Sequence, residues 1–358
     1  MNDLPESLLD VPGLDSLGPH EVDVLRLLLN GGSVVDWIRL HFRDRRAIDD
    51  FLRVNELDPD DEMDQARIAD VQARAIAYLT EHLRYRLSES VRQASIQELC
   101  ELASGKGRRA HRLHACLVLK VIHIIHHVEA YELLSTMAIS HHEVAILLQA
   151  KVERVVRRLI DRNAPVVDFA GNTKTYHSTL SKLLAKKDTH AAQVFDRLRF
   201  RLVVARPPDI PALLVALTRT LIPFPYLVPS QSENTLIDLD ALLRQHHNRA
   251  VDEPDGLNEN VASPKPTPRN EFSGPDYRVV NFVAQVPVRV DRVMPLQSRR
   301  HMGLGPVVFG TVEFQVVDRA TALHNDSGAN RHTLYKRRQT TRVRERLERG
   351  KRQRKASP

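Results

Sequence analysis

The spacing of apolar residues changes character near Pro165. Up to about residue 160, apolar residues recur at intervals of three and four, which is typical of amphipathic helices. Beyond that point, runs of β-branched residues alternate with helical stretches, a pattern typical of a mixed sheet. The sequence therefore predicts an α+β protein, with an all-helical N-terminal half followed by a mixed β-sheet domain flanked by helices.

The same spacing locates the individual segments. Asp64 and Ser95 have side chains that favour a helix N-cap. Helices are expected over 20–29, 34–52, 64–87, 96–103, 109–134 and 142–162, and then over 177–186, 210–221, 236–245 and 329–347. Strands are expected over 198–204, 226–228, 279–290 and 307–317.

Two segments differ in composition from the rest. Residues 248–276 hold too little apolar surface to order themselves, so we expect a long mobile loop there. The segment from Lys336 to the end holds 11 Lys/Arg and 2 Asp/Glu, a charge of +9 in a chain whose net charge is +7. The expected division is a helical domain over 1–163, a second domain over 164–340, and a basic tail over 341–358.

Composition limits the class of protein. At 358 residues and 42% hydrophobic composition, the chain is long enough for two domains. Its longest apolar run, around 116–125, is interrupted by Lys120 and His123, so we expect no membrane span. The acidic N-terminus lacks the order of a secretory signal, and we expect a cytoplasmic protein. Two cysteines are too few for a disulfide framework or a cysteine-only zinc site.

The basic tail suggests a polyanionic partner. Its density of cations favours RNA, the ribosome or another anionic surface through counterion release. A solvated, nonspecific tail is the alternative.

Lys174, Ser178 and Lys182 are spaced by four residues, which on a helix would align them along one face. A row of cations with a hydroxyl suits a triphosphate. A solvated helix face is the alternative.

Carboxylates occur within apolar strand candidates. Asp196 lies just before the strand candidate over 198–204, and Arg201 follows it by five residues. Glu313 and Gln315 share one face of the strand candidate over 307–317. Binding of Mg²⁺ and phosphates would account for them. Alternatively, Asp196 caps a turn, and Glu313 pairs with Arg289 or Arg199.

In their order, these segments resemble the synthetase domain of the RelA/SpoT alarmone enzymes. That family pattern runs Arg-x-Lys-x3-Ser-x3-Lys, Asp-x4-Arg, Gly-Tyr-x3-His, Glu-x-Gln and His-x2-Tyr-Lys. The match covers just under half of the chain, and the resemblance implies a nucleotidyltransferase-like fold for the second domain. The matching residues are Lys174, Ser178, Lys182, Asp196, Arg201, Tyr277, Glu313, Gln315, His332, Tyr335 and Lys336.

The resemblance also implies a reaction, the Mg²⁺-dependent transfer of pyrophosphate from ATP to a ribose hydroxyl of a nucleotide, usually GDP or GTP. Asp196 and Glu313 would hold Mg²⁺ and carry catalysis, and Tyr277 would stack on the acceptor base. Glu313 is also the candidate to deprotonate the acceptor hydroxyl. The remaining matches would bind the phosphates of ATP (Lys174, Ser178, Lys182, Arg201) or support the acceptor side (Gln315, His332, Tyr335, Lys336).

The chain departs from the family pattern at four places. Asn172 replaces an arginine, Asp276 a glycine, Asn281 a histidine, and Val317 an arginine. Two alternatives therefore stay open: a catalytically silent nucleotide- or RNA-binding module of the same fold, and a transferase acting on RNA. The acceptor and the oligomeric state are also open, and an oligomer is compatible with the sequence.

His123 and His127 are spaced as a metal-binding pair would be, but no acid stands at the position of an HExxH motif. Packing histidines are the favoured interpretation. The chain also has no His-Asp dipeptide, on which the hydrolase domain of long RelA/SpoT proteins is built. We therefore expect no hydrolase half.

Overall fold

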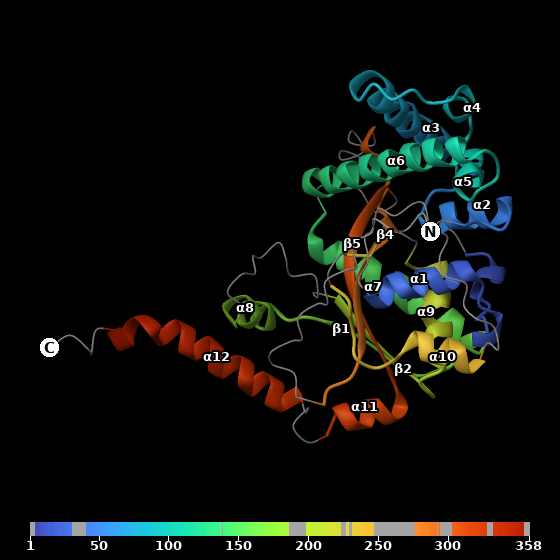
Figure 1. The fold of residues 1–358 in the computed structure, drawn as a ribbon. Coiled ribbons are helices and arrows are strands. Elements are labelled where there is room, and N and C mark those ends of the chain that lie inside the picture. The colour runs from blue at the N-terminus through green and yellow to red at the C-terminus, as the bar shows by residue number, and fades with distance from the viewer. Residues whose placement is uncertain are drawn as a thin grey trace.

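The computed structural model describes residues 4–30, 41–137, 139–185, 198–222, 227–228, 231–246, 276–291, 293, 303–327 and 332–353. Within these ranges the protein is α+β, with helices and one mixed sheet (Figure 1). The helices up to residue 161 are α1 (Pro19–Asn30), α2 (Arg45–Val54), α3 (Glu62–Ala77), α4 (Glu89–Arg92), α5 (Ile96–Ala103), α6 (Arg109–Thr136) and α7 (His141–Asp161). Those beyond are α8 (Tyr176–Ala185), α9 (Asp209–Thr220), α10 (Leu239–His246), α11 (Arg319–Asn325) and α12 (His332–Gln353).

The sheet has five strands in the order β1-β2-β5-β4-β3. β2 and β5 are parallel, and the other neighbours are antiparallel. The strands are β1 (Val166–Thr173), β2 (Leu198–Val204), β3 (Glu233–Asn234), β4 (Val280–Arg289) and β5 (Val307–Asp318). Because side chains alternate between the two faces of a strand, the apolar and polar residues of β2 and β5 separate onto opposite faces.

The apolar face of the sheet is the centre of the larger core. Phe200, Phe282 and Phe314 are fully buried on it, and the rings of Phe282 and Phe314 lie 5.3 Å apart. α7 supplies Leu148 and Val152 to the same core, and α1 and α9 also contribute. The expected domain boundary near residue 163 stays a prediction. This core contains side chains from both sides of that residue.

A second core lies among the first helices. It joins α2, α3, α5 and α6 through side chains such as Ile48, Ala75, Leu99 and Leu119. α6 crosses the β4–β5 hairpin at the end where β5 begins (Figure 1). There the ring of His127 stacks on Phe309, with centroids 4.1 Å apart. This contact ties the second core to the sheet.

Hydrogen bonds at the helix ends confirm one expected N-cap and correct two starting points. Ser95 forms a capping box with Glu98. Asp64 does not cap α3, because Asp61 precedes the helix and accepts from the amide of Asp64 at 3.0 Å. Of the helix expected over 34–52, residues 34–40 lie outside the described residues and 41–44 are not helical, so α2 begins at Arg45, where the side chain of Asp44 accepts from the amide of Ala47.

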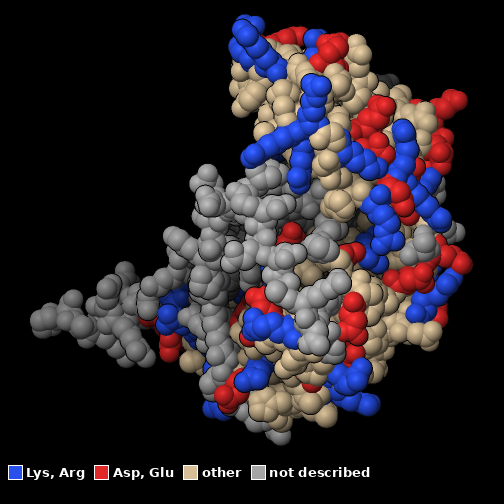
Figure 2. Space-filling model, turned by 45° about the vertical axis from the view of Figure 1, so that its right-hand side comes forward, with Lys and Arg blue, Asp and Glu red and all other residues tan. Residues whose placement is uncertain are grey.

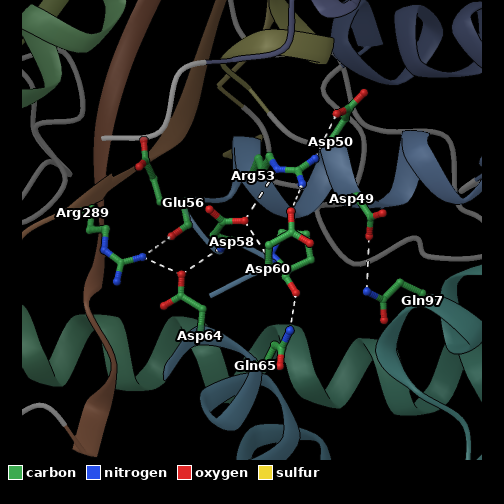
Figure 3. Close-up of polar contacts among 11 residues, drawn as sticks. Asp49, Asp50, Arg53, Glu56, Asp58, Asp60, Asp64, Gln65, Gln97 and Arg289 are labelled. Carbon is green, nitrogen blue, oxygen red and sulfur yellow. Dashed lines mark hydrogen bonds and ion pairs between the residues drawn. The ribbon is translucent and has the colours of Figure 1, made fainter. Parts of the chain in front are cut away.

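Polar contacts join the α2–α3 connection to the sheet (Figure 3). Arg289, at the end of β4, donates to the carboxylate of Asp64 at 2.6 Å and to the carbonyl of Glu56 at 3.2 Å. Arg53 holds the turn itself, with its guanidinium 2.7 Å from Asp60. The helical half is thus held to β4 by ion pairs as well as by apolar packing.

Several predictions fall on residues that the structure does not describe. The expected mobile loop over 248–276 lies outside the described residues except for Asp276. Of the strand expected over 226–228, Leu227 forms a single bridge with Ala284.

α6 is long and apolar enough to cross a membrane by length and composition alone, with a mean hydropathy of 1.3 in its best window. Core helices of soluble proteins pass the same test, and α6 buries Ala115, Val118 and Leu119 in the second core. The expected absence of a membrane span stays a prediction.

Candidate functional site

The polar face of the sheet carries the sequence motifs of β2 and β5. In the register of these parallel strands, Arg199 lies beside Glu313, and Arg201 lies beside Gln315. All four side chains alternate with buried apolar residues, so they share the face opposite Phe200 and Phe314. α6 lies on this face at one end through Phe309, and α11 packs at the other through Ala322.

Glu313 is the central carboxylate of this face, with 6% of its surface exposed. Arg199 donates from Nε to Glu313 Oε2 at 2.8 Å, and Gln315 donates to Glu313 Oε1 at 3.3 Å. The pairing with Arg199 is one of the alternatives that the sequence left open. The other, pairing with Arg289, does not occur because Arg289 lies opposite Val307, six residues along β5 from Glu313. Arg289 pairs with Asp64 and Asp291 instead.

Arg201 forms a bidentate ion pair with a residue that follows α11. Its two terminal nitrogens lie 3.3 and 3.2 Å from the carboxylate oxygens of Asp326, which directly follows α11. The Asp326 side chain is 64% exposed, and exposed pairs contribute only about 0–1 kcal/mol. Exchanging this carboxylate for a phosphate would therefore cost little.

Tyr277 lies next to these charges, just before β4. Burial raises the pKa of its phenol, and the nearby charges of Arg199 and Arg201 lower it. Asn325, at the end of α11, fixes this segment because it accepts from the amide of Arg278 and donates to its carbonyl at 2.6 Å. α11 therefore positions the tyrosine that was predicted to stack on a base.

Asn281 also lies on the polar face, paired in register with Gln315. Its side-chain Oδ1 is buried and accepts no hydrogen bond among the described residues. A buried acceptor without a donor costs about 1–3 kcal/mol, which a bound ligand with an N–H or O–H group would recover.

The structure aligns on one helix face only part of the segment that was predicted to bind phosphates. α8 begins at Tyr176, so Lys174 lies before the helix, and only Ser178 and Lys182 share a helical face. The hydroxyl of Thr175 accepts from the amide of Ser178 at 3.3 Å, which sets the start of the helix after Lys174.

α8 packs against α12 beside the sheet (Figure 1). Lys336 of α12 donates to the hydroxyl of Ser178 at 3.4 Å. Two motifs that lie far apart in the sequence therefore meet here.

Two of the predicted site residues fall wholly or partly outside the described structure, although His332 is the first residue of α12. Asp196 lies outside the described residues, and so does the side chain of His332. Tyr335 is half-buried on α12, one residue before Lys336. Among the residues that the structure describes, no group of three or more His, Cys, Asp and Glu side chains could hold a metal ion.

The sequence treated Arg199 only as an alternative partner and Asn281 only as a departure from the family pattern. The alternation Leu198-Arg199-Phe200-Arg201 was the signal for Arg199, since it places two arginines on one strand face. No sequence pattern indicated that Asn281 Oδ1 would be buried without a donor among the described residues.

The described surface carries both signs of charge. On the face shown in Figure 2, acidic and basic side chains are interspersed, without one dominant field. This agrees with the −2 that residues 1–335 carry once the basic segment from Lys336 onward is set aside.

No protein-family model matches the sequence, and no curated protein matches it. Among solved structures, small alarmone synthetase 1 from Bacillus subtilis matches at 14% identity and a TM-score of 0.30, over 56% of this chain and 83% of that one. A GTP pyrophosphokinase family protein from Streptococcus pneumoniae matches at 13% identity and a TM-score of 0.31, over 57% and 84%. Small alarmone synthetase 2 from Bacillus subtilis matches at 14% identity and a TM-score of 0.29, over 61% and 89%. The overall likeness is low, so the function proposed below rests on the positions of the motif residues.

Proposed function

We propose that this protein is a Mg²⁺-dependent nucleotide pyrophosphokinase-like transferase that moves pyrophosphate from ATP to a nucleotide such as GDP or GTP. The observation that carries the proposal is the pairing of β2 with β5. It places two arginines beside a buried carboxylate and its neighbouring amide on one polar face. Cations and a carboxylate on one face are the side chains that the binding and transfer of phosphate groups require.

The donor side would be built around the start of β2. Leu198 of β2 pairs with Thr173 of β1 on one side and with Val312 of β5 on the other. Lys174 directly follows Thr173 in the chain, and Glu313 directly follows Val312. Two strand spacings separate β1 from β5, about 10 Å. Lys174, Ser178, Lys182 and Arg201 would bind the phosphates of ATP across this interval.

The acceptor side would lie toward β4. Tyr277 would stack on the acceptor base, and Asn281 Oδ1 would accept a hydrogen bond from it. Gln315, His332, Tyr335 and Lys336 would support the acceptor. Its hydroxyl oxygen would attack the β-phosphorus of ATP, the bond to the α–β bridging oxygen would break, and AMP would leave. Glu313 would take the proton of the hydroxyl.

The chemistry of Glu313 fits a Mg²⁺ ligand. A carboxylate offers about four lone-pair sites, and Arg199 and Gln315 use one on each oxygen. Mg²⁺ is commonly held by one or two carboxylates together with substrate phosphates, so Glu313 would serve with Asp196. The bound ion would neutralise charge on the transferring phosphates.

A silent nucleotide-binding module is the second candidate. The ion pair between Arg199 and Glu313, at 2.8 Å, already neutralises the carboxylate that catalysis would use. Asn172 also stands where the family pattern has an arginine, and Asn281 stands where it has a histidine. In this case nucleotides would bind without reacting.

The test uses the full chain with ATP labelled at the α or the γ phosphate, Mg²⁺, and GDP, GTP, ADP, AMP or tRNA as acceptor. Transfer of pyrophosphate gives a product labelled only from γ-labelled ATP, together with AMP. We expect Glu313→Gln to lower the rate by at least 100-fold while nucleotide affinity stays within a few-fold, because the amide keeps the size of the side chain. Glu101→Gln on α5 is the matched control and should leave the rate unchanged.

Each other outcome has a definite meaning. Nucleotide binding without any product would establish the silent module, and a product on tRNA alone would favour the transferase acting on RNA. A role of the basic tail in RNA binding stays a prediction, for which removal of residues 341–358 should weaken RNA binding and reduce its salt dependence.

A further inference from the structure

One side of α6 carries exposed apolar side chains. The helix packs on α3, α5 and the β4–β5 hairpin (Figure 1), and Val118 on that side is fully buried. The side that points away carries Leu113, Ile124, Val128 and Tyr131, of which Val128 is 59% and Tyr131 74% exposed. Successive intervals of 11, four and three residues keep them in line along the helix. We call these four residues the α6 stripe.

The connection between α3 and α4 extends the α6 stripe at the start of the helix. The amide of Ser88 donates to Nδ1 of His114 at 3.3 Å, which holds the connection beside Leu113. Leu83 and Tyr85, a few residues before Ser88, are both exposed. We call these two side chains and the α6 stripe together the apolar patch.

Unpaired cations border the apolar patch. Residues 81–88 and 108–136 hold five exposed Lys and Arg side chains that form no ion pair with the described residues. The exposed carboxylates of the same segments are Glu81 and Glu132, which leaves an excess of three positive charges. Two of the cations alternate with the exposed side chains of the α3–α4 connection, and one lies within the α6 stripe. The five are Arg84, Arg86, Arg108, Arg109 and Lys120.

We propose that the apolar patch and its cations bind the surface of an anionic phospholipid bilayer, with α6 lying parallel to the membrane. A bilayer interface takes up both kinds of side chain, because the aliphatic ones enter the acyl boundary while arginine and lysine bind lipid phosphates. The rings of Tyr85 and Tyr131 suit the headgroup level. α6 does not cross the bilayer, since its other side is buried in the second core. This contact does not involve the nucleotide site.

Two other partners match this surface less well. RNA would use the cations, but its phosphates and bases gain little from exposed leucine, isoleucine and valine side chains, because bases stack on aromatic rings. A second copy of the chain would cover the aliphatic side chains but would bring two positively charged surfaces together, which disfavours association. An anionic bilayer satisfies the apolar and the charged part at once.

The test is sedimentation of the full chain with phosphatidylcholine vesicles that contain about one third phosphatidylglycerol, at an ionic strength of about 0.1 M. We expect binding at least tenfold tighter than to vesicles of phosphatidylcholine alone, and weaker binding as salt is added, because salt screens the cations. No sedimentation with the anionic vesicles would overturn the proposal, and so would equal affinities for the two kinds of vesicle.

Matched variants locate the surface. Arg109→Gln should weaken binding to the anionic vesicles about fivefold, the contribution of one cation near such a surface. Ile124→Asn combined with Val128→Asn should weaken it at least tenfold, because two apolar side chains no longer enter the bilayer. Arg319→Gln and Leu323→Asn, at exposed positions of α11, are the controls and should leave binding unchanged. Circular dichroism checks that each variant folds.

Three results would assign the surface differently and refute the proposal. The first is vesicle binding that survives the double substitution in a folded protein. The second is a dimer in light scattering that the double substitution dissociates, without vesicle binding, which would assign the α6 stripe to a second copy. The third is binding of an RNA oligonucleotide that Arg109→Gln weakens, again without vesicle binding.

Discussion

Acidification should destabilise this protein through three histidines of α6. His123, His126 and His127 lie between the second core and the sheet, where His126 and His127 both contact the ring of Phe309. Burial lowers the pKa of each from the ordinary 6.5 to about 3. The folded protein therefore keeps these imidazoles neutral at a pH where the unfolded chain protonates them.

The sign and size of the effect follow from proton linkage. Between pH 6.5 and pH 3 the unfolded chain binds more protons than the folded protein, so the free energy of unfolding falls as the pH falls through this window. From pH 7 to pH 5, each histidine with pKa values of 6.5 unfolded and about 3 folded contributes a loss of about 2 kcal/mol. Three such groups give up to about 6 kcal/mol, a large part of the roughly 5–15 kcal/mol that folded proteins have.

Urea denaturation at pH 7, 6 and 5 measures this loss directly. His123→Gln should reduce the loss between pH 7 and pH 5 by about 2 kcal/mol, because glutamine does not titrate. His142→Gln, at an exposed position of α7, is the control and should leave the loss as it is in the unmodified protein. A His123→Gln protein that loses as much stability as the unmodified one would refute the reasoning.

Two further predictions concern buried contacts around α7. Lys151→Met should lower the free energy of unfolding by about 3–5 kcal/mol in urea denaturation, because it leaves the carboxylate of Glu56, 2.7 Å from Lys151 and 4% exposed, without its partner. Adding Glu56→Gln should recover part of that loss, and no recovery would contradict the electrostatic cause. Gly310→Ala should cost about 1–3 kcal/mol, since its Cβ would lie 2.0 Å from the buried Leu148 side chain. In a Leu148→Ala background the same change should cost less, and an equal cost would argue against the clash.

The sequence predicted most elements of the second half because their apolar pattern is strong. The strand expected over 198–204 is β2, and the helix expected over 210–221 matches α9 within one residue. In the first half, the helix expected over 96–103 matches α5. β1 was missed because its strand-favouring residues, chiefly Val166, Val167 and Phe169, lie at its start. Gly171 and Asn172, in its second half, are residue types that strands disfavour. α11 was missed because its start depends on the side chain of Asp318, which accepts from the amides of Ala320 and Thr321.

The candidate site could be predicted only as a set of residue types. Alternation along β5 placed Glu313 and Gln315 on one face, as the structure shows. Which arginine would lie beside Glu313 depends on the register between β2 and β5, which no local pattern encodes. The four-residue spacing suggested that Lys174, Ser178 and Lys182 could share a helix face, although the expected helix began only at residue 177. The structure keeps Lys174 outside the helix, because Thr175 sets the start of α8 at Tyr176.

The largest core bears on whether residues 164–340 can fold without the helices that precede them. α7 places six apolar side chains of that core at under 9% exposure, among them Leu148, Val152 and Val156. At roughly 1.5–3 kcal/mol each, their removal would cost about 10 kcal/mol or more, comparable to the whole stability of a typical domain. A chain that begins at residue 164 should therefore show no cooperative thermal transition by calorimetry, whereas the intact chain should show one. A cooperative transition in the shortened chain would mean that the sheet has a core of its own, and that the division near residue 163 separates two folding units.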